Sequence, residues 1–417
     1  MSTIDTQLTV HDAVARVLRD VRVLGEEELP LLSAYGRVLA CDIVSPVTLP
    51  PWDNSAMDGY AVHAADLTML PVALPVLETV RAGGTATQPL PRGHAIRIMT
   101  GAPVPAGADT VVRVEDTDGG VDRVEVRRDR DAGKNVRPRG EDIHAGQLVL
   151  PAGTTIGAAQ MGVLASVGAA DVIVHRVPRV AILTSGDELV ELDRFQDVRD
   201  GKRIVSSNSV TLQALVRAAG GEPHYLGIAA DDPESLRTHL RRAVGFDLLI
   251  TSAGVSVGEH DFLRSVLGEL GAELKFWRVR MRPGAPMVFG MLGEMPWLGL
   301  PGNPVSTMVT FELFARPAIR KMRGHSRLFR RPVPVTMEEP VHAGADLTHF
   351  QRAILTTRDG QRTARLTGRQ SSGILTSMSL ANALVIVPAG RGNVAAGETL
   401  HALPFDGDAE LAEQFAL

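Results

Sequence analysis

A short apolar segment that runs into a loop of small residues and then into a helical segment constrains this chain more than any other feature. Residues 246–250 have the composition of a buried strand, and residues 262–270 have that of a helix. The loop between them, residues 251–261, reads TSAGVSVGEHD. A strand, a small-residue turn and a helix in this order are typical of the phosphate-binding edge of α/β domains. An ordinary turn with a capping aspartate is the alternative.

The residue types in this loop suit an anion and a divalent cation. Gly254 and Gly258 let the backbone approach a ligand closely, and Ser252 and Ser256 add hydroxyl donors. Asp261 supplies a carboxylate near the start of the helix, where a divalent cation can bridge to a phosphate. The loop therefore predicts a metal-assisted phosphate site.

Strand and helix patterns alternate around this loop. Residues 179–184 predict a buried strand that ends in the acidic loop 185–189, residues 207–219 predict a helix, and Asp232-Pro233 predicts the start of another. This alternation predicts a parallel sheet with helices on both faces. The glycine spacing matches neither a dinucleotide-binding fingerprint nor a P-loop.

The rest of the chain predicts further domains, because 417 residues exceed one typical core. Residues 71–145 alternate short apolar runs with glycine and proline, which predicts a β domain, and the chain after residue 330 has the same character. Residues 31–40 predict a short helix. Residues 52–61 (WDNSAMDGYA) are too acidic for a core strand, so we expect a surface turn or a polar binding loop there.

Three arginines stand at alternate positions: Arg278, Arg280 and Arg282. On a strand this spacing puts all three side chains on one face. Either an oxyanion partner or a solvated basic edge strand accounts for such a face. Farther along, residues 300–304 (LPGNP) predict a tight turn, and residues 305–322 predict a helix whose free amides favour anions.

Composition and missing motifs argue against several classes of protein. A net charge of −5 and an aromatic content of 4% argue against nucleic-acid binding. No His or Cys cluster has zinc-ligand spacing, and no G-x-S-x-G motif indicates acyl transfer. The chain has a single cysteine, no signal-peptide pattern and no apolar run that would span a membrane, so we expect a cytoplasmic protein.

Six motifs, in this order, resemble the molybdopterin molybdenumtransferase (molybdenum insertase) family, which includes the E domain of gephyrin. They are residues 53–61 (DNSAMDGYA), 98–103 (IMTGAP), 139–143 (RGEDI), 184–189 (TSGDEL), 254–258 (GVSVG) and 300–306 (LPGNPVS). Each motif is modest alone, but the ordered set covers nearly the whole chain and is specific.

The resemblance implies an elongated multidomain subunit of α/β and β domains. The implied domains are a helical N-terminal domain (1–45 and 146–177), an inserted β domain (46–145), a three-layer molybdopterin-binding α/β domain (178–328) and a C-terminal β-barrel (329–417). The implied reaction is insertion of molybdenum from molybdate into the dithiolene of adenylated molybdopterin, with release of AMP and a requirement for Mg²⁺. A homodimer and, as a possible partner, the molybdopterin adenylyltransferase are also implied.

The resemblance also assigns roles to individual residues. The catalytic residues it implies are Asp58, Thr100, Glu188 and Asp261, with Asp261 and Glu188 holding Mg²⁺. The substrate- and phosphate-binding residues it implies are Ser252, Gly254, Ser256, Gly258, Asn208, Arg278, Pro301 and Asn303. Molybdate would be bound by Arg282, Arg352, Ser377 and Ser379. Asp58 and Thr100 of the partner subunit would complete the site.

Three positions depart from the family pattern. Ala285 stands where lysine is common, so one molybdate cation is missing, and Arg280 is a candidate substitute. Ala253 replaces a common glycine, and Ser206 stands where some members have aspartate. A preference for tungstate or weak activity is therefore an alternative. A scaffolding protein or a pterin carrier on the same frame is a second alternative to the enzyme.

Overall fold

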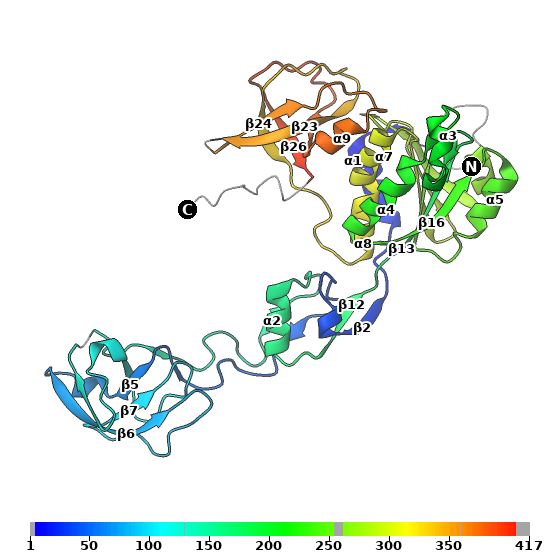
Figure 1. The fold of residues 1–417 in the computed structure, drawn as a ribbon. Coiled ribbons are helices and arrows are strands. Elements are labelled where there is room, and N and C mark those ends of the chain that lie inside the picture. Colours follow the sequence, from blue (N-terminus) through cyan, green and yellow to red (C-terminus); the bar gives the residue numbers. More distant parts are fainter. Residues whose placement is uncertain (1–4, 129, 254–261, 359, 406–417) are drawn as a thin grey trace. The chain divides into compact units, whose positions relative to one another are not determined.

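The computed structural model describes residues 5–128, 130–253, 262–358 and 360–405, which form two compact units (Figure 1). The first consists of Met1–Glu28 with Ile173–Leu417 and is called the α/β–barrel unit. The second, Leu29–Val172, is called the insert unit. The four predicted domain boundaries remain predictions. Gly254, Ser256, Gly258 and Asp261, which the sequence assigns to the phosphate and metal site, lie outside the described residues.

A seven-stranded sheet forms the centre of the α/β–barrel unit. Its order is β1 (Asp5–Leu8), β18 (Ala272–Val279), β20 (Val288–Leu292), β21 (Met295–Leu300), β17 (Leu248–Ser252), β13 (Arg179–Ser185) and β16 (Glu222–Ala229). The prediction of a parallel sheet is wrong at β20, which runs antiparallel to both of its neighbours. The reason is local: only Gly293 and Glu294 separate β20 from β21, and so short a connection joins antiparallel strands.

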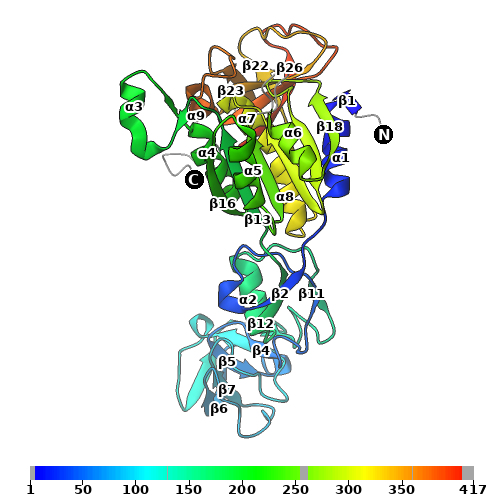
Figure 2. The ribbon, with the colours of Figure 1, turned by 90° about the vertical axis from the view of Figure 1, so that its right-hand side faces the viewer.

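Helices cover both faces of this sheet, as the sequence predicts (Figure 2). Because side chains alternate along a strand, Val180 and Ile182 of β13 pack on one face and Ala181 and Leu183 on the other. The first face carries α1 (Val10–Asp20), α4 (Ser207–Ala219), α7 (Pro304–Thr310) and α8 (Arg316–Met322). The second carries α5 (Pro233–Arg241) and α6 (Phe262–Glu269).

Several helix predictions are confirmed and two are corrected. Helix α5 begins as expected, because the Asp232 carboxylate accepts hydrogen bonds from the amides of Glu234 and Ser235 at 2.9 Å. The helix predicted over 305–322 is interrupted by a wider turn at Phe311–Ala315. The helix predicted over 31–40 is only a single 3₁₀ turn at Leu31–Ser33.

The C-terminal part of this unit is a small closed barrel. Its five strands are β22 (Val333–Met337), β23 (Thr348–Arg358), β24 (Gln361–Leu366), β25 (Ala383–Val387) and β26 (Thr399–Pro404), and pairing of β23 with β25 closes the ring. The two-residue strand β19 (Met281–Arg282) pairs in parallel with the start of β23. The short helix α9 (Thr376–Leu380) precedes β25. Part of the chain between β18 and β20 therefore belongs to the barrel sheet.

The insert unit is mostly β structure. Its main sheet has the order β8 (Thr110–Arg113), β5 (Gly59–Val62), β7 (Ala95–Ile98), β6 (Val72–Val80) and β9 (Arg123–Val126). The expectation that residues 52–61 avoid core structure is wrong for β5, whose four residues are all buried. Gly59 explains this, since a Cβ there would lie 1.9 Å from the Val112 carbonyl oxygen. Only glycine permits so close an approach of strands β5 and β8.

Smaller elements complete the described structure. They are β2 (Glu26–Pro30) with β12 (Asp171–His175), β3 (Ile43–Val44) with β11 (Leu148–Leu150), β4 (Asn54–Ser55) with β10 (Val136–Arg137), β14 (Leu189–Val190) with β15 (Ile204–Val205), α2 (Ala158–Ser166) and α3 (Phe195–Arg199). Among the described residues, the helices are too short or too polar to cross a membrane.

One buried polar contact fixes the edge of the sheet that carries the predicted phosphate loop. The indole Nε1 of Trp297 on β21 donates to Thr251 Oγ1 on β17 at 3.0 Å, and both side chains are buried. We expect Trp297→Phe to lower the free energy of unfolding of this unit by about 1–2 kcal/mol, because the Thr251 hydroxyl loses its donor. Chemical denaturation measures the change. Adding Thr251→Val should cost less than the sum of the single changes, and full additivity would contradict this coupling.

Candidate functional site

Two adjoining cavities in the α/β–barrel unit contain seven of the twelve predicted site residues that the structure describes. The hydroxyl cavity, of about 700 Å³, is lined by residues including Thr184, Glu188, Ser206, Asn208 and Ser252. The arginine cavity, of about 840 Å³, is lined by residues including Arg282, His349, Gln351, Arg352, Ser371 and Ser372. Pro286, Pro301 and Asn303 line both. The two cavities therefore meet at the turn before α7, where the sequence predicts substrate binding.

Asn208, in the first turn of α4, connects the elements around the hydroxyl cavity. Its Nδ2 donates to Ser252 Oγ at 2.8 Å, at the end of β17, and to the Gly302 carbonyl at 2.7 Å. Its Oδ1 is buried and has no hydrogen-bond partner among the described residues. The amide thus fixes the positions of β17, α4 and the turn before α7, and leaves one polar atom for a ligand or a water.

Neutral hydroxyl groups surround Ser206, the position at which the resemblance implies an aspartate in some members. Ser206 is buried, and its Oγ lies 3.4 Å from Thr184 Oγ1. Thr184 Oγ1 in turn lies 3.2 Å from the hydroxyl of Tyr225, which donates to Glu191 at 2.8 Å. Burial raises the pKa of Tyr225 to about 12, so this chain of hydroxyls stays neutral at physiological pH.

Glu188 is the acidic residue that lines the hydroxyl cavity. It is exposed, and its carboxylate folds back over the backbone of Gly186. Within the described residues, no group of three His, Cys, Asp or Glu side chains is close enough to hold a metal ion. A cation here would therefore need oxygens from a substrate or from Asp261 in addition to Glu188.

The described start of the predicted phosphate loop has an unusual backbone conformation. Ala253 has a φ of 78°, in the left-handed region that favours glycine. Its amide donates to the Leu300 carbonyl at 3.1 Å, and its Cβ lies 3.3 Å from where a Cβ on Gly302 would stand. This geometry explains in physical terms why glycine suits position 253.

The arginine cavity is built around a buried cation. Arg352 on β23 is fully buried, and its guanidinium donates to Ser377 Oγ (3.0 Å) and to the carbonyls of Gln370 (3.2 Å), Arg369 (3.3 Å) and Ser371 (3.0 Å). All four acceptors are neutral, and no acidic side chain pairs with it among the described residues. Burial lowers the pKa of Arg352 to about 10, which still leaves it charged at pH 7.

The prediction that three arginines share one strand face is wrong. Arg278 has a φ of 70°, and the strand breaks after Val279, so that Arg282 lies on β19 in the barrel sheet. Arg282 is exposed and lines the arginine cavity, whereas Arg278 and Arg280 line a different one. Arg280 donates to the Asp346 carbonyl at 3.0 Å. Ala285 lines both of these cavities, so Arg280 remains the candidate for the missing cation.

The two serines predicted to bind molybdate do not line the arginine cavity. Ser377 accepts from Arg352 and donates to the Ile374 carbonyl at 2.6 Å, and Ser379 is exposed and donates to the Thr376 carbonyl at 3.0 Å. The serines that line the cavity are Ser371 and Ser372. No local sequence pattern assigns a role to Ser371 or Ser372, or to the cavity residues His342 and His349.

The remaining predicted residues, Asp58 and Thr100, lie together in the insert unit. Asp58 Oδ1 accepts from both the amide and the hydroxyl of Thr100 at 2.7 Å. These two hydrogen bonds hold the pKa of Asp58 below its usual value, so the exposed carboxylate is ionised at neutral pH. Sequence spacing gave no indication of this contact, because 42 residues separate the partners.

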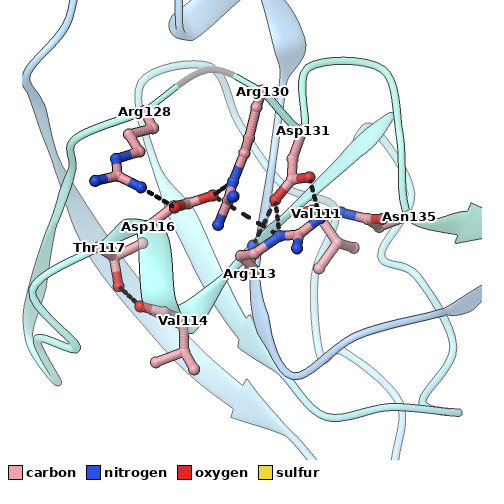
Figure 3. Close-up of polar contacts among 9 residues, drawn as sticks. All are labelled: Val111, Arg113, Val114, Asp116, Thr117, Arg128, Arg130, Asp131 and Asn135. Atoms are coloured by element: carbon pink, nitrogen blue, oxygen red, sulfur yellow. Dashed lines mark hydrogen bonds and ion pairs between the residues drawn. The ribbon is translucent and has the colours of Figure 1, made fainter.

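A charged network supports the turn that carries Asp58 (Figure 3). Arg113, at the end of β8, donates through Nε and Nη2 to the buried Asp131 carboxylate, both at 2.9 Å. Asn135 lies four residues after Asp131. Its backbone carbonyl accepts from the Ala56 amide at 2.9 Å, and its side-chain Nδ2 donates to the Val111 carbonyl at 2.8 Å. The Asp131 loop is thereby tied to both β8 and the Asp58 turn.

A second buried acid lies beside this network. Asp116 is buried and pairs with the guanidinium of Arg130, while Arg113 and Arg128 lie 3.7 and 3.8 Å away (Figure 3). The two acids and three arginines hold Arg128 and residues 130–135 close to β8, next to the turn that carries Asp58.

Comparisons with known proteins agree over nearly the whole chain. Three family models match: the MoeA N-terminal region (domain I and II) at residues 8–168, a probable molybdopterin binding domain at 181–321, and the MoeA C-terminal region (domain IV) at 334–405. A molybdopterin molybdenumtransferase from Nostoc sp. is 38% identical over 89% of this chain and 87% of that protein. Another from Haemophilus influenzae is 35% identical over 96% and 99%.

The fold is also similar to a solved structure. A crystal structure of the molybdopterin biosynthesis moeA protein from Pyrococcus horikoshii matches with a TM-score of 0.82 and 29% identity, covering 95% of this chain and all of the other. This similarity agrees with the α/β–barrel and insert units described above.

The Arg113 hydrogen bonds lower the pKa of Asp131 to about 2, so the contribution of this carboxylate to stability depends on the pH. The Arg113 hydrogen bonds stabilise the charged carboxylate, so this stabilisation is present above the usual value of 3.8 and is lost as the pH falls towards 2. We expect Asp131→Asn to destabilise the insert unit by about 2 kcal/mol at pH 7, and by much less near pH 2. Calorimetry at the two pH values measures this. Glu115→Gln, an exposed acid near Arg113, is the control, and an equal loss at both pH values would contradict the mechanism.

Proposed function

The chain belongs to the molybdopterin molybdenumtransferase family, and on this premise we propose that it inserts molybdenum from molybdate into the dithiolene of molybdopterin during molybdenum cofactor biosynthesis. The observation that carries the proposal is the pair of adjoining cavities with different chemistry. One offers neutral hydroxyl and amide groups, and the other a buried cation without an acidic partner. A large polar organic substrate and a small oxyanion can therefore bind side by side.

The hydroxyl cavity supports a phosphate-bearing pterin as its ligand. It lies at the carboxyl ends of β13 and β17, where open α/β sheets bind ligands. Ser252 and Asn208 bring polar groups to this edge, and the start of α4 adds backbone amides. We propose that the pterin binds as its adenylate and that AMP is released in the reaction.

Mg²⁺ fits the residues at this edge, although only one of its predicted protein ligands is described. This ion commonly uses one or two carboxylates and completes its shell with water and substrate phosphates. Glu188 lines the hydroxyl cavity, and Asp261 is the predicted second carboxylate. When bound, the ion would neutralise phosphate charge as the adenylate leaves.

The arginine cavity supports molybdate binding through charge. A doubly charged tetrahedral anion would satisfy both the exposed cation Arg282 and the buried, acid-free cation Arg352. The guanidinium donors of Arg352 are already bonded to neutral oxygens, so it acts on the anion chiefly through its field. The donors of the exposed Arg282 are not occupied in this way, and we propose that Arg282 contacts the anion directly.

The assembly of the site remains part of the proposal. The family resemblance implies a homodimer in which Asp58 and Thr100 of the partner subunit complete the substrate cleft. The rigid support beneath the Asp58 turn is consistent with a positioning task. We also propose the molybdopterin adenylyltransferase as the supplier of the adenylated substrate.

Removing the predicted metal ligands tests the enzyme against a scaffold or a passive pterin carrier. Protein is given adenylated molybdopterin, molybdate and Mg²⁺, and AMP release is followed. We expect Glu188→Gln and Asp261→Ala to slow release at least about tenfold, since a lost charge-assisted contact is worth roughly 1.5–3 kcal/mol. Asp193→Asn, an exposed acid on the same segment that does not line the cavity, should match wild type. Equal rates in all four proteins, or none in any, would refute these roles.

The arginine cavity provides a separate test of molybdate binding. We expect Arg282→Gln to raise the KM for molybdate roughly 10- to 100-fold, because one charge-assisted contact is lost while the dithiolene site is intact. Arg280→Gln is the matched control, since that arginine lines the neighbouring cavity. Equal effects of the two substitutions would show that only overall charge matters. Repeating the series with tungstate tests the alternative metal preference.

A further inference from the structure

One end of the arginine cavity contains polar atoms that the proposed function does not use. His349 and Gln351 on β23 both line the cavity, and only 5% and 7% of their surfaces are exposed. His349 Nε2 and Gln351 Oε1 are buried and have no hydrogen-bond partner among the described residues. Leaving such atoms unpaired is unfavourable, so a cavity that holds two of them is suited to a polar ligand.

Strand pairing sets His349 beside the exposed cation of the same cavity. In the parallel ladder of β19 and β23, Arg282 is the register partner of His349. Gly344 lines the cavity on the other side of the ring, and a Cβ there would stand 3.8 Å from His349 Nε2. Arg282 and the backbone of Gly344 therefore both lie near the ring.

The charges around this ring are mostly positive. Arg282 faces it from β19, His342 lines the cavity from the segment before β23, and Arg352 lies three residues along the same strand. Asp346, in that preceding segment, lines the neighbouring cavity instead, and β25, which pairs with His349 through Val387, has no ionisable side chain. Burial lowers the pKa of His349, the charge of Arg282 lowers it further, and the Gly344 backbone offsets part of this.

We propose that His349 is a specificity residue of the arginine cavity, whose Nε2 donates a hydrogen bond to a bound tetrahedral oxyanion and which takes up a proton as that anion enters. This inference rests on the proposed function, because it assumes that the cavity receives molybdate. Without a ligand the ring is neutral, since a second cation beside Arg282 is unfavourable. A dianion reverses that balance, so binding and protonation favour each other.

The proposal supplies the donor that position 285 lacks. Ala285 has no cation to offer, and Arg280 lines the neighbouring cavity, whose wall Ala285 shares, and donates to the Asp346 carbonyl. A histidine in that role differs from a lysine, because its charge depends on the pH and on the ligand. Oxyanion affinity should therefore fall as the pH rises through the pKa of the anion-bound ring, a range in which a lysine would stay charged.

Nuclear magnetic resonance of the imidazole groups of the full-length protein tests the coupling directly. Sodium molybdate is the probe, with sodium chloride at matched ionic strength as the reference, and His349→Gln assigns the signal. We expect saturating molybdate to raise the pKa of His349 by about one pH unit or more, which is a tenfold coupling. An unchanged pKa of His349 overturns the proposal.

Molybdate affinity at pH 6 and pH 8 gives the second measurement. Wild type and His401→Gln, which changes a histidine that lines a different cavity, should bind several-fold more tightly at pH 6 than at pH 8, whereas His349→Gln should bind with the same affinity at both. A pH dependence that survives in His349→Gln overturns the proposal. AMP release from the full reaction distinguishes a failure of the His349 proposal from a failure of the proposed function. If the His349 measurements fail while AMP release is normal, the proposed function stands. Loss of AMP release with a normal His349 response refutes the proposed function alone.

Discussion

A buried positive charge without an acidic partner is the constraint on which the substrate-binding region depends. Arg352 is fully buried, and the oxygens that receive its hydrogen bonds are all neutral. Those bonds hold the backbone of residues 369–371, of which Gln370 and Ser371 also line the cavity. The folded chain therefore leaves this cation beside the cavity without a negatively charged partner. A buried charge of this kind is normally paired. An oxyanion is the partner that would complete it.

The position of this charge follows from the junction between two hydrophobic cores. Along β23, Phe350 packs into the core of the α/β sheet, and Ala353 packs into the core of the barrel. Between them lie Gln351 and Arg352, at a strand edge that borders both cores. The break after Val279 matters for the same reason, because it transfers Arg282 from the α/β sheet to the barrel sheet. Two cores that meet at one strand therefore create the cavity.

The acidic side chains of this molecule differ from Arg352 in how their charge is stabilised. Asp131 and Asp58 are held in the ionised form by donors, arginine in one case and a threonine amide and hydroxyl in the other. The hydroxyl cavity, by contrast, is lined by neutral groups around Ser206 and Thr184, with Glu188 at its margin. A cavity with little fixed negative charge can accept phosphates without repulsion and leaves the cation to compensate them.

Local sequence patterns determined the elements, and tertiary structure decided the sites. The helix over residues 207–219, the capped start at Asp232 and the buried strand before the phosphate loop were predicted from the chain, because periodicity and capping act over a few residues. Six ordered motifs also identified the family. Alternate spacing failed for Arg278, Arg280 and Arg282, because one left-handed residue and a change of sheet separate them. The pairing of Asp58 with Thr100 and the position of His349 beside Arg282 join residues far apart in the chain. Contacts of that kind depend on how sheets pair and cores pack, which no local pattern encodes.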